Sequence, residues 1–469
     1  MSLAAVAKME SKLLLATYDR QPVLFERGQG VHLWDSRGKR YLDFLSGIGV
    51  NALGHNHPAI QKVIRRQAGR LIHVSNLFFH EYQAKLAEKL TKISGLDRAF
   101  FCNSGTEAWE GALKLARAFA RTNIRNGQKP KWRILAMENS FHGRTFGALA
   151  TTGQKKYRTP FAPLVPGVVF VNFNDREDLE RKFDGSVCAV CMEAVQGEGG
   201  IVPVDREFFE AARRLTEQTG ALLILDEIQC GLGRTGRHFA YQHYNVRPDI
   251  VTVAKPLAAG LPLGAILTTE RVAGCIHPGM HGTTFGGGPL ACAVAIEFLR
   301  AEQGLLKHVG SVGKYFHQAL TGLDKKHRTI QDVRGAGLMQ AVELDSAELA
   351  KAVVKELLEE GIIINRTHET VLRFLPPYIV EKKHVDEVIA ALDRALGRER
   401  AVTKKARAKA GTTTTGKTAT GKSTAGKSTE GKSRESKVRI SEAKSKISGS
   451  EREQEDAGGA QHEEIYAHA

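Results

Sequence analysis

The central part of the chain alternates between short apolar runs and longer amphipathic segments. The short runs are rich in Val, Ile and Leu and lack a helical period, which is typical of strands buried on both faces of a sheet. They predict strands at Arg133–Glu138, Val168–Phe173, Val187–Glu193, Ala221–Asp226, Asp249–Ala254 and Ala265–Thr269. Because amphipathic segments separate these runs, the pattern predicts an α/β core on a mostly parallel sheet.

The amphipathic segments have apolar residues three and four positions apart, the period of a helix with one buried face. They predict helices at Ala59–Arg70, Tyr82–Thr91, Thr106–Arg121, Arg206–Thr219, Leu290–Gln303, Ala347–Glu360 and Lys382–Leu396. Near the N-terminus, Val31–Trp34 and Arg40–Phe44 flank a turn sequence at 35–38, which predicts a hairpin. We therefore expect smaller α+β parts at both ends of the chain.

The composition changes near Arg398, and from there to the end of the chain Lys, Thr, Ser, Gly and Ala dominate. Such a segment cannot bury enough apolar surface to offset its ordering entropy, so we predict a disordered tail at 398–469. Gly411–Thr418 matches the GxxxxGK[ST] pattern of a phosphate-binding loop. The pattern recurs every five residues without a flanking strand or helix, so we interpret it as low complexity.

The formal net charge is +16 over 469 residues, which raises the question of nucleic-acid binding. The charge is spread along the chain and no groove-reading motif accompanies it, so we expect no specific nucleic-acid partner. No apolar run approaches eighteen residues and no secretory signal pattern is present, which predicts no membrane span. Reduced cysteines fit the cytoplasmic location that we expect.

Six cysteines are present, and Cys188 and Cys191 have a CxxC spacing. They lie in the predicted strand Val187–Glu193, where positions three apart face opposite sides. We therefore expect small core residues and no metal site.

Lys255 is the first candidate for chemistry. It follows the predicted strand Asp249–Ala254 and precedes Pro256 and a glycine-bearing loop. Burial at the end of a strand lowers the pKa of an amine and favours Schiff-base chemistry. A solvated lysine at a strand end is the alternative.

Asp226 ends the apolar strand before Glu227. A carboxylate at the carboxyl edge of a parallel sheet lies where such folds bind ligands, and it can keep a pyridine nitrogen protonated. A helix cap or a structural ion pair is the alternative.

Three further groups can bind anions or a planar ring. Ser104, Gly105 and Thr106 precede a predicted helix, whose N-terminal amides suit a phosphate, although an ordinary capped helix has the same pattern. Phe141 can stack on a ring, and Arg144 can bind a carboxylate. Arg373 lies in an apolar run and needs an acceptor, for which Glu193 is the candidate. Structural ion pairs remain the alternative for both arginines.

Seven segments in this order resemble the class III aminotransferases of the ornithine and acetylornithine type. They are Ser46–Pro58, Asn103–Ala108, Phe141–Thr145, Glu193–Gly200, Leu225–Gly236, Ala254–Pro256 and Thr283–Gly287. The resemblance spans roughly residues 15–397. It implies the pyridoxal-phosphate transferase fold (fold type I), with N-terminal small-domain residues 1–58, a large domain at 59–290 and C-terminal small-domain residues 291–397.

The resemblance also implies roles for the residues that bind pyridoxal 5'-phosphate. Lys255 would hold the cofactor as a Schiff base and move the proton, and Asp226 would pair with the pyridine nitrogen. Gln229 would contact the phenolic oxygen and Phe141 would stack on the ring. Ser104, Gly105 and Thr106 would hold the phosphate, with Thr284 reaching in from the second subunit of a homodimer.

For substrates, the resemblance implies that Arg144 and Arg373 bind carboxylates, with Thr283 nearby. Glu193 would mask Arg373 for a diamine-type donor and release it for glutamate. Trp109, where the family usually has a smaller residue, is expected to narrow the entrance.

The implied reaction moves the terminal amino group of N-acetylornithine to 2-oxoglutarate, giving a semialdehyde and glutamate. Ornithine, succinylornithine, 4-aminobutyrate or a lysine-pathway intermediate could replace the donor, because few pocket residues decide among them. Two functions of a different class stay open beside it: amino-acid racemisation on the same fold, and nucleic-acid binding through the basic tail.

Overall fold

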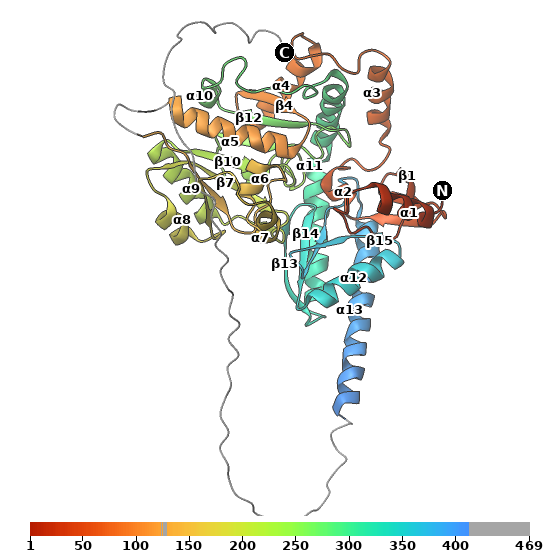
Figure 1. Cartoon of the computed structure of the whole chain (residues 1–469). Coiled ribbons are helices and arrows are strands. Elements are labelled where there is room, and N and C mark those ends of the chain that lie inside the picture. Colours follow the sequence, from red (N-terminus) through yellow and green to blue (C-terminus); the bar gives the residue numbers. More distant parts are fainter. Residues whose placement is uncertain (123, 125–128, 412–469) are drawn as a thin grey trace, which may run out of the picture. The chain divides into compact units, whose positions relative to one another are not determined.

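The apolar runs of the central region form one seven-stranded sheet with the strand order β4-β12-β11-β10-β7-β5-β6 (Figure 1). The computed structural model describes residues 1–122, 124 and 129–411. The strands are β4 (Arg98–Cys102), β5 (Arg133–Met137), β6 (Val168–Val171), β7 (Val187–Glu193), β10 (Leu222–Asp226), β11 (Ile250–Val253) and β12 (Gly264–Thr268). Strand β12 runs antiparallel to both neighbours and the other neighbouring pairs are parallel. The predicted mostly parallel sheet is confirmed, with β4 as a strand that the pattern did not predict.

Successive residues of β10 show why this sheet carries helices on both faces. Leu222 and Ile224 pack in the core cluster that contains α5 (Gly105–Thr122). Leu223 and Leu225 point the other way and join the cluster that contains α9 (Arg206–Thr219). Because side chains alternate along a strand, a continuously apolar strand needs a helix on each side.

The two ends of the chain build smaller sheets. One has the order β1-β2-β3-β15 and another the order β13-β14-β17-β16. Their strands are β1 (Phe25–Gln29), β2 (His32–Asp35), β3 (Arg40–Asp43), β13 (Ile330–Ala336), β14 (Met339–Leu344), β15 (Ile362–Ile363), β16 (Asn365–Thr367) and β17 (Val371–Phe374). β2 and β3 form the predicted hairpin, and β15 pairs with β3 in parallel. A C-terminal strand therefore completes an N-terminal sheet.

The remaining short strands, β8 (Val195–Gln196) and β9 (Val202–Pro203), pair with each other beyond the end of β7. The longer helices besides α5 and α9 are α1 (Leu3–Leu13), α3 (Pro58–Ala68), α4 (Glu81–Ser94), α11 (Pro289–Asp324), α12 (Ala347–Glu359) and α13 (Lys382–Gly411). The shorter ones are α2 (Ser46–Gly49), α6 (Phe146–Thr151), α7 (Lys155–Arg158), α8 (Arg176–Lys182) and α10 (Glu270–Ala273).

Helix α11 connects the large sheet with the smaller ones. It packs against α3 and α4 at one end and against β13 and β14 at the other, and Figure 1 shows it crossing from one group to the other. The prediction ended this helix at Gln303, whereas it continues to Asp324. A Cβ at Gly304 would meet no atom within 4 Å, so that glycine interrupts the sequence pattern but not the packing.

The predicted start of the tail at 398 also differs from the structure, because α13 continues to Gly411. Helix-forming Ala, Lys and Arg dominate that stretch. The predicted disorder of 412–469, and nearly all of the phosphate-loop pattern, lie outside the described residues. Within the described residues, no helix is long and apolar enough to cross a membrane.

The two cysteines of the CxxC sequence depart from the expected geometry. The register between β5 and β7 shifts beside Cys188, and both thiols pack in the core cluster that contains α5. The expectation that they face opposite sides was therefore wrong, because it assumed a regular strand. Burial raises the pKa of the Cys188 thiol to about 11 and that of Cys191 well above its usual value.

Candidate active site

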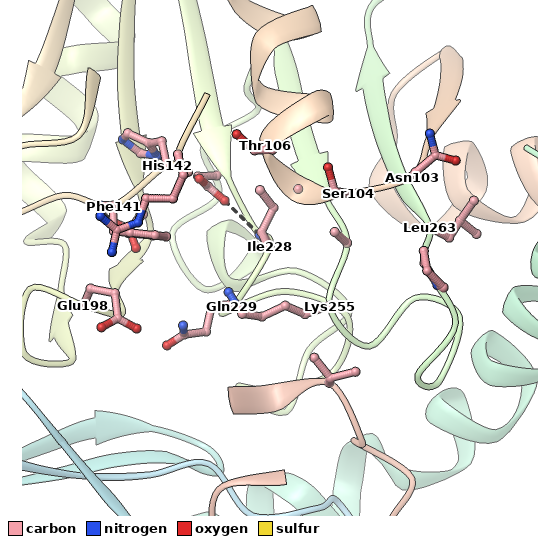
Figure 2. A pocket seen from close by; sticks show the side chains of 18 of the residues that line it. Asn103, Ser104, Thr106, Phe141, His142, Glu198, Ile228, Gln229, Lys255 and Leu263 are labelled. Carbon is pink, nitrogen blue, oxygen red and sulfur yellow. Dashed lines mark hydrogen bonds and ion pairs between the residues drawn. The ribbon is translucent and has the colours of Figure 1, made fainter. Parts of the chain in front are cut away.

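A cavity of about 450 Å³ opens where β10 and β11 end. This is the carboxyl edge of the parallel strands, where α/β sheets bind ligands. Figure 2 shows side chains from several separate segments around it. Its lining includes nine of the residues predicted from the sequence: Ser104, Gly105, Thr106, Phe141, Arg144, Glu193, Asp226, Gln229 and Lys255. The structure therefore brings together segments that lie far apart along the chain.

Lys255 is the amine of this cavity. It follows β11 directly, and its side chain is half-buried (Figure 2). Burial lowers the pKa of Lys255, while the carboxylates of Asp226 and Glu198 oppose that shift. An amine with a lowered pKa is more often in its uncharged, nucleophilic form.

Asp226 ends β10 and is 4 % exposed. Its Oδ1 accepts a hydrogen bond from the Ile228 amide at 3.0 Å, and its Oδ2 lies 2.8 Å from His142 Nδ1. Two contacts on two oxygens fix the orientation of the carboxylate, and Asp226 also lines the cavity. It can therefore present an oriented negative charge to a ligand.

The N-terminus of α5 forms another wall of the cavity, through Ser104, Gly105 and Thr106. The Ser104 hydroxyl accepts a hydrogen bond from the Glu107 amide at 3.3 Å. A Cβ on Gly105 would lie 2.8 Å from the side chain of Ile228, so the close packing there requires glycine. Helix N-terminal amides favour an anionic ligand, and a phosphate suits this wall.

Phe141 and Arg144 line the cavity, and Arg144 also contacts Tyr157, an aromatic residue that the sequence did not single out. The Arg144 guanidinium lies 3.8 Å from the centre of the Tyr157 ring and 5.3 Å from that of Phe141. Among the residues that the structure describes, no carboxylate forms an ion pair with Arg144. The aromatic faces hold the guanidinium in place, and the guanidinium can bind a substrate carboxylate.

Glu193 ends β7 and is buried. It accepts hydrogen bonds from the amides of Gly197 at 2.9 Å and Phe141 at 3.1 Å. Burial, and secondly the charge of Asp226, raise the pKa of Glu193 to about 8. Glu193 therefore keeps the backbone around the cavity in place.

Arg373 is paired with an acid other than the predicted one. Its Nη1 lies 2.5 Å from Glu198 Oε1, so the expectation of a Glu193 partner was wrong. Glu198 lines the cavity and also accepts a hydrogen bond from Thr367 at 3.3 Å. Burial alone would raise the pKa of Glu198, but the Arg373 guanidinium outweighs it and holds that pKa below its usual value. The pair is therefore charged on both sides.

Arg373 itself lies in β17 and is 1 % exposed. Its Nε donates to Asn365 Oδ1 at 3.1 Å, and its Nη1 lies 3.4 Å from Gln229 Oε1. Gln229 lines the cavity, so Arg373 stands directly behind Gln229 and Glu198. Removal of Glu198 from the pair would free the guanidinium for a carboxylate that enters the cavity.

Two predicted residues lie at the edge of this arrangement. Thr283 accepts a hydrogen bond on its hydroxyl from Asn103 Nδ2 at 3.2 Å, and Asn103 lines the cavity. Thr284 is exposed. The structure of one chain thus connects Thr283 with the cavity wall and leaves Thr284 open to solvent or to another subunit.

Trp109 does not narrow the entrance, and that expectation was wrong. Its side chain is 0 % exposed, on the sheet-facing side of α5, and it stacks on His142. The sequence motif places Trp109 near the phosphate loop, but the helical period turns it away from the cavity mouth.

An amine, an oriented acid and an anion-binding helix end around one cavity define a site for a phosphate-bearing pyridine cofactor. The model of the family "Aminotransferase class-III" matches residues 15–396. The chain belongs to this family, and its cofactor is pyridoxal 5'-phosphate.

Relatives in other organisms carry a more specific name. The chain is 48% identical to an acetylornithine aminotransferase of Methanocaldococcus jannaschii, over 82% of this chain and 96% of the relative. It is 46% identical to one of Caldanaerobacter subterraneus subsp. tengcongensis, over 82% of this chain and 98% of the relative.

Solved structures share the fold. The ornithine aminotransferase of Toxoplasma gondii matches with a TM-score of 0.81 and 32% identity, over 86% of this chain and 96% of the other. The N-acetylornithine aminotransferase of Stenotrophomonas maltophilia matches with a TM-score of 0.72 and 35% identity, over 84% of this chain and 99% of the other.

Proposed function

We propose that the protein transfers the terminal amino group of N-acetylornithine to 2-oxoglutarate, giving the semialdehyde and glutamate, a step of arginine biosynthesis. One geometric observation supports a donor with one carboxylate and an acceptor with two: Arg144 lines the cavity without an ion-pair partner in the described part of the chain, and Arg373 lies behind the cavity, covered by Glu198. The acetylated donor is supported by the relatives that are named acetylornithine aminotransferase. N-acetylornithine has one carboxylate, and 2-oxoglutarate has two. A site with one free and one coverable guanidinium suits both.

Lys255, Asp226 and Gln229 have separate roles towards the cofactor. When bound, pyridoxal phosphate stores the amino group between the two half-reactions and withdraws electrons through its ring. In our proposal Lys255 attaches the cofactor and then moves the proton at the amine-bearing carbon of the substrate. Asp226 keeps the pyridine nitrogen protonated, and Gln229 donates to the phenolic oxygen.

The walls of the cavity orient the cofactor. Phe141 covers one face of the ring, and Ser104, Gly105 and Thr106 hold the phosphate at the N-terminus of α5. The tight fit of Gly105 against Ile228 supports this placement, because it brings the backbone amides close to the ligand.

The substrate side uses the two arginines. Arg144 binds the carboxylate of the donor, and Thr283, which accepts a hydrogen bond from Asn103 in the cavity wall, is a second substrate contact. Glu198 covers Arg373 while the donor is bound and withdraws for the second carboxylate of glutamate. Glu193 supports the cavity wall, because its carboxyl group accepts hydrogen bonds from the amides of Phe141 and Gly197.

We further propose a homodimer in which Thr284 completes the phosphate site of the partner subunit. The loop that carries Thr284 is fixed on both sides of this residue, because Asn76 Nδ2 donates to the carbonyls of Thr283 and Gly286 at 3.1 Å. The same loops expose a group of apolar side chains that a second subunit would cover: Leu77, Phe78, Phe79, Met280 and Phe285.

The domain division and the location are part of the same proposal. Residues 59–290 form the cofactor-binding domain, and 1–58 with 291–397 form the small domain. The pairing of β15 with β3, which joins the two chain ends, supports the small domain. We place the enzyme in the cytoplasm, where its proposed substrates are metabolised.

Visible absorption of the purified protein tests the proposal. The band of the bound cofactor should bleach on addition of N-acetylornithine alone and return on addition of 2-oxoglutarate. A band that responds instead to ornithine, succinylornithine or 4-aminobutyrate would keep the enzyme class and overturn the donor. Stoichiometric glutamate formation excludes a racemase, because a racemase leaves 2-oxoglutarate unchanged.

A further inference from the structure

Behind Asp226, two buried rings are stacked face to face. The indole of Trp109, on α5, and the imidazole of His142 have centroids 3.9 Å apart and planes inclined by 9°. Both side chains are almost fully buried, at 0 % and 2 % exposure. The flat stack lets the imidazole turn only within its own plane.

The contacts of His142 decide which of its nitrogens carries the proton. Nδ1 lies 2.8 Å from Asp226 Oδ2, so a proton on Nδ1 makes a hydrogen bond to the carboxylate. Nε2 is buried and, within the described part of the chain, has no hydrogen-bond partner. A proton on Nε2 would be buried without an acceptor, which is costly. The arrangement therefore selects the tautomer with Nδ1 protonated.

The indole is anchored on its far side. Trp109 Nε1 donates to Thr151 Oγ1 at 2.8 Å, and Thr151 in turn donates to the Ala148 carbonyl at 3.0 Å. Both of these partners lie in α6. A continuous set of contacts thus runs from α6 through Trp109 and His142 to Asp226.

We propose that Trp109 is a positioning residue that acts on Asp226, the acid that faces the cofactor. Its indole holds the imidazole of His142 in the plane and tautomer that keep the Asp226 carboxylate aimed into the cavity. Trp109 acts through His142 and does not touch the ligand. This inference rests on the proposed function only in that Asp226 faces the pyridine nitrogen.

The test compares Trp109→Leu, which removes the stacked ring, with Trp109→Phe, which keeps a ring but loses the bond to Thr151. The first readout is the pair of ¹⁵N shifts of His142 in the cofactor-loaded protein, assigned by their absence from His142→Asn. The second is the dissociation constant of pyridoxamine 5'-phosphate, which binds without the covalent bond to Lys255. Partners behind metal-ligating residues change metal affinity by about 10–100-fold, and we take the lower end of that range for the partner of an acid that faces an organic ligand.

In Trp109→Leu we expect shifts that average the two tautomers and an affinity about tenfold weaker. Trp109→Phe should retain the wild-type shifts and affinity. Leu113→Ala is the control, because Leu113 is buried on the same helix and in the same core cluster. It should lower the melting temperature without either effect.

If Trp109→Leu lowers the melting temperature as Leu113→Ala does and leaves shifts and affinity unchanged, Trp109 is only a core residue and the inference is wrong. If Trp109→Leu does not fold, Trp109→Met, which also lacks a ring but fills more of the space of the indole, gives the same two readouts. A wild-type protein that binds no pyridoxamine phosphate would overturn the proposed function instead, whatever the shifts of His142.

Discussion

Glu198 and Arg373 form an ion pair, 2.5 Å between Oε1 and Nη1, behind the cavity that contains Lys255. Arg373 is almost fully buried, whereas the side chain of Glu198 is 23% exposed. The carboxylate can therefore move towards solvent more easily than the guanidinium can. If Glu198 covers Arg373 for one substrate and uncovers it for another, the carboxylate must move while the guanidinium stays in place, and this difference in exposure allows that.

The first prediction concerns Glu198→Gln, which keeps the shape of the side chain and removes its charge. Glutamate should then meet a guanidinium that is no longer neutralised, while N-acetylornithine should gain nothing from it. We expect the ratio of kcat/KM for glutamate to that for N-acetylornithine to rise by about tenfold or more, equivalent to about 1.4 kcal/mol. Single-turnover half-reactions with each donor, followed by absorption, measure it.

Glu270→Gln is the matched control, because it removes the surface ion pair of Glu270 with Arg98, 2.6 Å long and exposed on both sides. In Glu270→Gln, the ratio of kcat/KM for glutamate to that for N-acetylornithine should stay unchanged. An equal loss with both donors in Glu198→Gln would show that the pair only supports the fold.

The second prediction concerns Lys255. Lys255→Arg retains the positive charge but lacks an amine that forms a Schiff base, and Lys255→Ala lacks both. Because the proton transfer and the attachment depend on the same atom, both variants should lose the visible band and at least about 10³-fold in kcat. Lys89→Ala, at an exposed position of α4, should keep both. A Lys255→Arg variant with ordinary turnover would contradict the assignment.

Glu193 and Glu198 show where the sequence stopped being informative. Both belong to one motif, five positions apart: Glu193 ends an apolar strand and Glu198 follows that strand. The sequence predicts an acid for Arg373 but not which one, because that depends on the short hairpin of β8 and β9 after Glu193. The positions of Lys255 and Asp226 were easier to predict, because the end of an apolar run in the sequence shows where the strand ends.

Tertiary packing explains the remaining differences between prediction and structure. Trp109 follows the phosphate loop in the sequence, but α5 packs against β11 and β12 with Trp109 in the buried core between them. Strand β4 is short and begins with a charged residue, so its pattern alone does not separate it from a loop. Its pairing with β12 makes it a strand. The ion pair, the stack on His142 and β4 all depend on contacts between distant segments.

The third prediction follows from the raised pKa of Glu193, which is about 8 because of burial and the nearby Asp226. The folded protein keeps a proton on Glu193 at pH values where the unfolded chain has lost it. This contribution to the free energy of unfolding is therefore complete below the ordinary pKa of 4.5 and is lost as the pH rises towards 8. One proton contributes a slope of at most about 1.4 kcal/mol per pH unit.

Denaturant unfolding of the cofactor-free protein between pH 5 and pH 8 measures that slope. Glu193→Gln cannot ionise, so its free energy of unfolding should fall less steeply with pH than that of the wild type. Glu227, whose pKa burial raises to about 7, titrates in the same range and remains in both proteins, so the comparison isolates Glu193. Identical slopes in the two proteins would contradict the prediction.

The fourth prediction concerns Gly105→Ala at the N-terminus of α5. The added Cβ would lie 2.8 Å from Ile228 Cδ1 and 2.9 Å from its Cγ2, so the helix end and the wall of the cavity must move apart. Because the amides would then leave the phosphate, we expect about tenfold weaker binding of pyridoxamine 5'-phosphate. The double variant Gly105→Ala with Ile228→Val should recover part of the affinity, because the second change removes Cδ1.

Gly304→Ala in α11 is the matched control for a glycine in a helix, since its Cβ would meet no atom within 4 Å. It should stabilise the protein by about 0.5–1 kcal/mol and leave cofactor affinity unchanged. Titration of the cofactor-free variants by calorimetry gives the affinities, and denaturant unfolding gives the stabilities. Equal affinities for the wild type and Gly105→Ala would place the phosphate elsewhere in the cavity, because a helix end that tolerates the extra methyl group is not in close contact with a ligand.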